Sequence, residues 1–161
     1  MNRFWKTVLL TGLFVGTTDI MDAYISVYVS SGKFADKMFQ YIAGGALGLD
    51  KSLQGGTAIA LLGLFFHYFI AISFTAFFFL VFPRVKFLSF NKYMIGILYG
   101  IFTNLVMTFL ILPLTSLPSQ PFNLSRSVFD WIIFGTIFGI PIAYNAYKYY
   151  KVDEKTNHSV S

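Results

Sequence analysis

The sequence predicts an all-α protein, a four-helix transmembrane bundle with a short amphipathic interfacial helix between spans 1 and 2. Hydrophobic residues make up 56% of the 161 residues and charged residues only 12%, about half of the roughly 25% typical of soluble domains. Four apolar stretches each reach the roughly 20 residues that a helix needs to cross a bilayer. These stretches are continuous, without the alternation of a membrane β-barrel. The length accommodates one transmembrane domain, residues 1–150.

The predicted spans cover residues of about 4–29, 57–82, 93–112 and 127–147. Pro83 follows the second span and Pro113 the third, and proline ends helices because it lacks an N–H and clashes with the preceding turn. Pro141 lies inside the fourth span. It should leave the Ile137 carbonyl without its helical donor and kink the helix.

The first span contains two carboxylates, Asp19 and Asp22. A cleaved signal peptide would need a small-residue cleavage site near this point, but the two acidic residues occupy it. We therefore predict a retained helix.

The segment after the first span has its own helical pattern. Phe34, Met38 and Ile42 recur at four-residue spacing, with charged and polar residues on the opposite side. This pattern predicts an amphipathic helix that lies in the membrane interface. Such a helix is either a lid over the mouth of the bundle or a simple surface cover.

Lysine and arginine fall unevenly on the two sides of the membrane. With the N-terminus inside, eight lie inside: Arg3, Lys6, Arg84, Lys86, Lys92, Lys148, Lys151 and Lys155. Four lie outside: Lys33, Lys37, Lys51 and Arg126. The positive-inside rule then places both termini in the cytoplasm, and we predict a multi-pass protein of the bacterial inner (plasma) membrane.

The net charge of +5 is explained by contact with anionic lipid head groups. The expected partner is therefore the lipid bilayer and not nucleic acid. The polar residues 151–161 are predicted to form a disordered cytoplasmic tail.

Small residues recur every three or four positions along each span. Three glycine pairs have the spacing that lets helices approach closely in lipid: Gly12 with Gly16, Gly96 with Gly100, and Gly135 with Gly139. The same spacing serves packing inside one bundle or a homo-oligomer formed through these small faces, and both alternatives stay open.

Asp19, His67 and Asn104 lie on these small stripes, near the middle of their spans. A charged side chain at the centre of a transmembrane helix costs about 2.5–3.5 kcal/mol on insertion scales. Asp19 should therefore be protonated, partnered or hydrated, and we predict that His67 and Asn104 face it. Asp22 lies one turn further out, about 60° round the helix. These four residues form the candidate substrate- or ion-binding site.

Catalytic chemistry has less support. The chain has no cysteine and lacks the motifs of zinc proteases, P-loop nucleotide-binding proteins and serine hydrolases, so we expect no cofactor and no metal, and a non-enzymatic role is favoured. Ser127 and Asp130 match an approximate capping box, which predicts that Asp130 caps the fourth span.

Several short motifs resemble those of small, uncharacterised bacterial inner-membrane proteins that are YagU-like in layout. They are residues 12–20, Gly63-Leu64-Phe65-Phe66-His67, Phe82-Pro83-Arg84, Tyr99-Gly100 and Gly139-Ile140-Pro141-Ile142-Ala143. The resemblance covers residues of about 1–150 and implies a four-helix inner-membrane protein, with no activity or site residues attached.

Three functions remain open. The first is transport or channel-like handling of protons, a cation or a small solute through the Asp/His/Asn site. The second is a structural or partner-binding membrane protein in which the polar residues hold helices together. The third is a membrane-embedded metal-dependent enzyme that uses Asp19, Asp22 and His67 as ligands.

Overall fold

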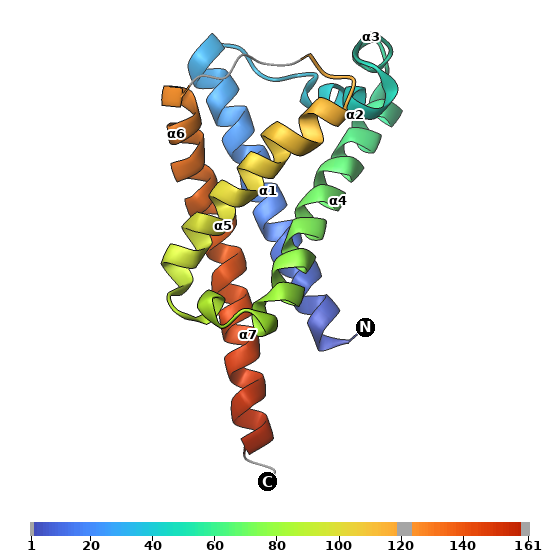
Figure 1. Ribbon diagram of the computed structural model, residues 1–161. Coiled ribbons are helices and arrows are strands. Elements are labelled where there is room, and N and C mark those ends of the chain that lie inside the picture. Colours follow the sequence, from blue (N-terminus) through green and yellow to red (C-terminus); the bar gives the residue numbers. More distant parts are fainter. Residues whose placement is uncertain (1, 119–123, 159–161) are drawn as a thin grey trace.

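Four long apolar helices form a bundle, and the end of α7 extends beyond the others (Figure 1). The structure is a computed structural model that describes residues 2–118 and 124–158. The first long helix is α1 (Arg3–Ser31), and the second is α4 (Thr57–Val81) with the short η1 (Phe82–Arg84) at its end. The third consists of α5 (Lys92–Val106), η3 (Met107–Ile111) and η4 (Leu112–Leu114). The fourth consists of α6 (Leu124–Phe134), η5 (Gly135–Gly139) and α7 (Ile140–His158).

Each long helix contains a stretch long and apolar enough to cross a membrane: Arg3–Ser31, Thr57–Arg84, Lys92–Leu114 and Ser127–Lys151. These stretches confirm the all-α fold and agree with the four predicted spans. α7 continues to His158, into the segment 151–161 for which we predicted disorder, and residues 159–161 lie outside the described residues.

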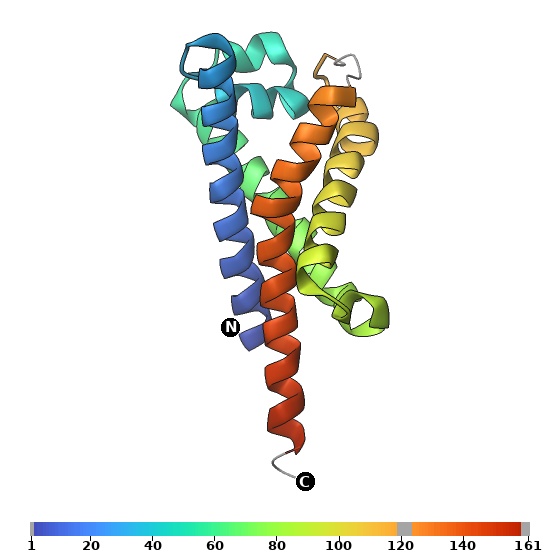
Figure 2. The same cartoon turned by 90° about the vertical axis from the view of Figure 1, so that its left-hand side faces the viewer.

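The two ends of the bundle differ (Figure 2). Both termini lie at one end together with η2 (Lys86–Ser89), which we call the terminal end. The short helices α2 (Met38–Leu47) and α3 (Leu49–Leu53) lie at the other, which we call the α2 end. Both termini are thus on one side of the molecule, as the predicted topology requires.

Local chemistry explains where the helices begin and end. The Asn2 side chain accepts a hydrogen bond from the N–H of Phe4 and caps α1, and Asn91 caps α5 by accepting from two N–H groups, the role in which asparagine is favoured. Gly32 closes α1 in the left-handed conformation, with φ 68°, which glycine adopts without steric cost.

The paired glycines pack the long helices against one another inside the chain. A Cβ on Gly12 would lie 2.9 Å from the Ile72 backbone of α4. A Cβ on Gly100 would lie 2.4 Å from the Cα of Gly135, and Gly96 and Gly139 meet as closely. These small faces are therefore covered within one chain, and a homo-oligomer would need other surfaces.

The helix α2 packs against the outer half of α4. At their crossing, a Cβ on Gly63 would fall 1.8 Å from the Phe39 carbonyl oxygen, and Ala43 is fully buried. The predicted short helix between the first two spans is thus present. Gly63 is the residue of α4 at which the α2 backbone approaches most closely.

The tightest apolar core lies in the terminal half of the bundle. Phe78, Phe79, Ile95 and Ile142 are almost completely buried there, and Val8 of α1 joins them. Tyr150 donates its hydroxyl to the Phe79 carbonyl at 2.7 Å. This bond links α7 to α4 beside the buried apolar side chains.

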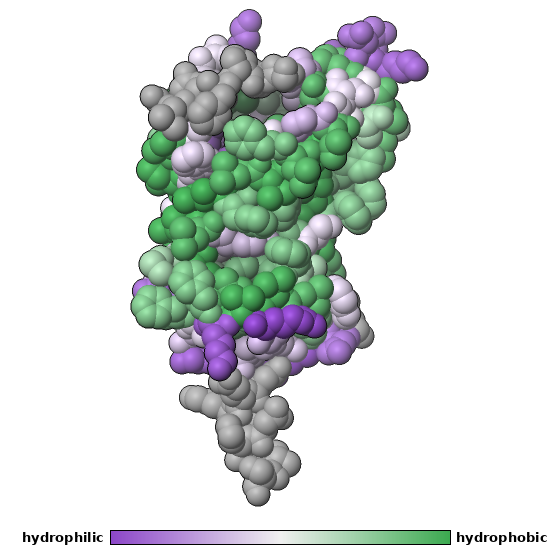
Figure 3. All heavy atoms as spheres, viewed as in Figure 1, coloured by the Kyte–Doolittle hydropathy of each residue, from purple (hydrophilic) through white to green (hydrophobic). Residues whose placement is uncertain are grey.

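The outer surface between the two ends is apolar (Figure 3). Large hydrophobic side chains such as Phe14, Leu61, Phe69 and Phe109 are more than half exposed. Soluble proteins rarely expose so continuous an apolar surface. Together with the four spans, this surface identifies a membrane-embedded protein.

Candidate functional site

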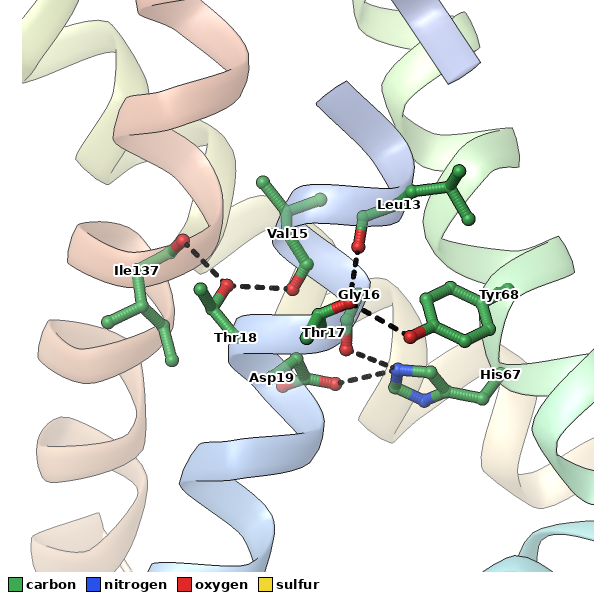
Figure 4. A network of polar contacts seen from close by, with 9 residues as sticks. All are labelled: Leu13, Val15, Gly16, Thr17, Thr18, Asp19, His67, Tyr68 and Ile137. Atoms are coloured by element: carbon green, nitrogen blue, oxygen red, sulfur yellow. Dashed lines mark hydrogen bonds and ion pairs between the residues drawn. The ribbon is translucent and has the colours of Figure 1, made fainter. Parts of the chain in front are cut away.

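Asp19 of α1 and His67 of α4 face each other in the interior of the bundle (Figure 4). His67 Nε2 lies 3.8 Å from Asp19 Oδ2, and the side chains are 14% and 27% exposed. The two helices hold this pair together because Gly16 packs against Tyr68 and Ala71 of α4. The predicted approach of Asp19 and His67 is present.

His67 donates a hydrogen bond from Nε2 to the backbone of α1. Its Nε2 lies 2.8 Å from the Gly16 carbonyl oxygen, and a carbonyl only accepts hydrogen bonds, so Nε2 carries the hydrogen. The longer 3.8 Å contact to Asp19 is beyond hydrogen-bond range. Among the described residues, Asp19 accepts no hydrogen bond.

The threonines before Asp19 tie α1 to its neighbours. Thr17 Oγ1 donates to Leu13 at 2.8 Å and lies 2.9 Å from the Tyr68 hydroxyl, so Tyr68 is the donor of that second bond. Thr18 Oγ1 donates to the Val15 carbonyl at 2.9 Å and makes a long contact of 3.5 Å with the Ile137 carbonyl (Figure 4).

The Ile137 contact bears on the predicted break at Pro141. The helix widens there into the π-helical turn η5, in which the Ile140 N–H donates to the Gly135 carbonyl. The break predicted from Pro141 thus takes the form of a π turn, and Thr18 reaches the Ile137 carbonyl that we expected to lose its donor. Single π turns inside helices are frequent at functional sites.

A pocket of about 220 Å³ lies between Asp19, His67 and the α2 end, large enough for several water molecules or a small solute. Its remaining wall is mostly apolar and includes Ala71, Phe74 and Phe138 on the terminal side. No lysine or arginine is among the described residues that line it.

Two segments cover the pocket at the α2 end. Tyr41, Ile42 and Gly45 of α2 line it, together with Thr115 and Leu117 of the segment that follows η4. The Ser116 N–H donates to the Gly45 carbonyl at 3.0 Å and joins the two segments. α2 therefore covers this end of the pocket, a position that a lid and a simple surface cover share.

Asn104 does not join this pocket. Its Oδ1 accepts a hydrogen bond of 3.1 Å from Trp131 Nε1 on α6, and it is not among the pocket's lining residues. The prediction that Asn104 faces Asp19 is therefore wrong. Asn104 lies four residues after Gly100, and Trp131 lies four residues before Gly135. Because Gly100 packs against Gly135, the bond between Asn104 and Trp131 continues the same helix contact by one turn. This spacing is the sequence signal that would have predicted the partner of Asn104.

Thr103 occupies the place predicted for Asn104. It lines the pocket, is 1% exposed, and its Oγ1 has no hydrogen-bond partner among the described residues. Tyr99, one turn earlier, donates its own hydroxyl to the Phe74 carbonyl at 2.6 Å. Thr103 thus contributes to the pocket wall with its hydroxyl oxygen almost completely buried.

Asp22 lies outside the pocket. It is partly buried on α1, close enough to Asp130 of α6 for their charges to interact. α6 begins at Leu124, so Ser127 and Asp130 lie inside the helix, and the predicted capping box is wrong because the helix starts one turn earlier. Among the described residues, no three His, Asp or Glu side chains converge to hold a metal ion.

No family model, curated protein or solved structure matches the chain. The resemblance to YagU-like proteins stays a prediction, and the site is interpreted from its own geometry.

Proposed function

We propose that this chain binds a proton, a cation or a small solute at Asp19 and carries it across the membrane. The observation that carries the proposal is that no described residue donates a hydrogen bond to the Asp19 carboxylate, which lies beside a pocket within a membrane span. A carboxylate that accepts no hydrogen bond at this depth is unfavourable. A water molecule, a proton or a bound cation would satisfy it.

The access to Asp19 favours a carrier over an open channel. The pocket reaches Asp19 from the α2 end, while the buried apolar core fills the terminal half. Release to the other side would therefore require the helices to move, as in alternating access. The π turns η3 and η5 interrupt two of the helices that would move.

The topology proposed from the lysine and arginine distribution gives this access a direction. With both termini in the cytoplasm of a bacterial inner membrane, the pocket lies toward the periplasmic side, beneath α2. A carrier this small would work as an oligomer, formed through surfaces other than the glycine faces.

A structural role is the second candidate, and one contact favours it. His67 joins α4 to α1 through the Gly16 carbonyl, as polar residues often do between membrane helices. In that case Asp19 would have no ligand, and the pocket would be a packing gap without a function.

Flux measurements separate the two candidates. Purified protein is reconstituted into liposomes containing a pH-sensitive dye, and uptake of protons and of radiolabelled methylammonium is compared for wild type, Asp19→Asn and Asp22→Asn. We expect Asp19→Asn to lower the flux at least about tenfold. Asp22→Asn is the matched control because Asp22 does not line the pocket, and it should keep most of the flux. Equal flux from wild type and Asp19→Asn would overturn the proposal.

A further inference from the structure

A second cavity lies between α4 and α5, beside the Asp19 pocket. It measures about 500 Å³, and Ser73 is the one polar residue among its described lining residues. Phe69 and Leu110 at its rim are 60% and 59% exposed. This groove therefore opens on the apolar outer surface, at a depth where the surroundings are lipid.

The two cavities share a wall. Ile70 and Phe74 of α4 and Ile111 of η3 line both of them. Ile111 is the last residue of the π turn η3, and π turns are points where helices adjust. These three side chains separate the groove from the pocket, and side chains change rotamer on short timescales.

We propose that the ligand of the Asp19 site is a lipophilic amine that enters from the bilayer through this groove. This inference rests on the function proposed above and names its substrate class. The ammonium group would bind Asp19, with the Thr103 hydroxyl nearby in the same pocket, and the apolar body would lie along the groove.

Charge complementarity selects an amine. Neither cavity has a lysine or arginine among its described lining residues, and Asp19 is their one carboxylate. A phosphate or a fatty-acid carboxylate would find no described lysine or arginine there and would lie beside the Asp19 carboxylate, and burying it unpaired is unfavourable. An ammonium ion would pair with Asp19, and the faces of Phe74 and Phe138 on the pocket wall attract cations.

The test uses three probes with the protein in lipid nanodiscs: octylamine, octanol and methylamine. Isothermal titration calorimetry, corrected with protein-free discs, measures their binding to wild type and three variants. Asp19→Asn removes the charge, and Ser73→Trp fills the groove. Leu61→Trp is the matched control, because Leu61 lies on the outer surface of the same helix and is 61% exposed without lining either cavity.

We expect octylamine to bind wild type at least about tenfold more tightly than octanol. Asp19→Asn should weaken octylamine about tenfold. Ser73→Trp should weaken octylamine by a similar factor and leave methylamine unchanged, while Leu61→Trp should bind both as wild type does. Equal binding of octanol and octylamine overturns the inference, and so does unchanged octylamine binding in Ser73→Trp.

A labelling experiment on wild type keeps the inference testable if Ser73→Trp fails to fold. A diazirine-bearing octylamine should label residues of α4 and α5 that line the groove. Labelling confined to α2 and the segment after η4 would overturn entry from the bilayer. If octylamine fails to bind while methylammonium flux still depends on Asp19, the inference is wrong and the proposed function stands. If methylammonium flux is also independent of Asp19, both are wrong.

Discussion

Asp19 and His67 are neighbours with different partners. His67 donates its Nε2–H to the Gly16 carbonyl, whereas Asp19 accepts no hydrogen bond from the described residues. A histidine that is fixed to the backbone gives the pocket a rigid wall, and the carboxylate beside it stays available to a ligand. At the scale of single residues, His67 therefore joins two helices, and Asp19 is the residue to which our proposal assigns ligand binding.

Replacement of His67 tests its structural part. His67→Ala removes the bond to Gly16, and interhelical hydrogen bonds in membrane proteins contribute about 0.6 kcal/mol on average and at most about 1.7. We expect a loss of free energy of unfolding in that range, measured by reversible denaturation in mixed micelles. His67→Gln should lose less, because its amide can still donate to the carbonyl. Equal losses in both variants would contradict the hydrogen-bond explanation.

For Asn104 we expect an effect on stability without an effect on flux. Asn104→Leu breaks the bond to Trp131 Nε1 and should lower the free energy of unfolding by about 1 kcal/mol. Because Asn104 does not line the pocket, methylammonium flux per folded molecule should stay unchanged. A loss of flux without a loss of stability would mean that Asn104 belongs to the binding site.

The sequence was sufficient to pair Asp19 with His67, because each lies on the small face of its helix and those faces pack together. It did not place Asn104, because neighbouring positions on a helix point about 100° apart. Thr103 and Asn104 therefore face different partners. The choice between them depends on how α5 is rotated against two neighbours at once, which a single stripe of small residues does not specify.

At the scale of elements, the position of α2 depends on one glycine. A Cβ on Gly63 would lie 1.8 Å from the Phe39 carbonyl oxygen, whereas a Cβ on Gly56 would meet no atom within 4 Å. Backbone atoms yield less easily than side chains, so any side chain at Gly63 must push α2 away from α4. The cover of the pocket is thus held where it is by close backbone contact.

Alanine at Gly63 should therefore displace α2 and expose the pocket. The chain has no cysteine, so Ile42→Cys provides a single labelling site on the pocket face of α2. We expect Gly63→Ala to accelerate maleimide labelling of this cysteine about tenfold or more, and Gly56→Ala to leave the rate unchanged. If both alanines leave the rate unchanged, α2 is not held by this contact.

The extent of the long helices follows from apolar composition and from proline, and the four spans were predicted within a few residues. The two π turns were not, because one extra residue in a turn leaves the apolar character of a span unchanged. The capping prediction at Ser127 failed for a related reason: α6 starts at Leu124, and short polar motifs match inside helices as well as at their ends.

At the scale of the whole molecule, the two ends of the bundle differ in structure. The terminal end holds the closed apolar core and both termini, and the α2 end holds the covered pocket. An embedded bundle must keep one orientation for this asymmetry to have a function. The bias of lysine and arginine toward the terminal end is the feature that would impose it.

Labelling in sealed vesicles tests this orientation. Single cysteines at Asn2 and Ser89, on the terminal side, should react with a membrane-impermeant maleimide from the cytoplasmic face. A cysteine at Asp50 of α3 should react from the opposite face. The measurement uses right-side-out and inverted vesicles from the same cells. Reaction of all three positions from one face would contradict the arrangement of spans.

The π turn η5 places a register offset in the middle of the fourth helix. One residue more than an α-helical turn rotates everything beyond it by about 100°, so α6 turns Trp131 toward Asn104 while α7 keeps Ile142 in the core. Deletion of the exposed Thr136 would remove the extra residue and the offset together, so a regular α-helix would then keep Trp131 and Ile142 on their present faces. This stretch should therefore tolerate the loss of one residue far better than the insertion of another.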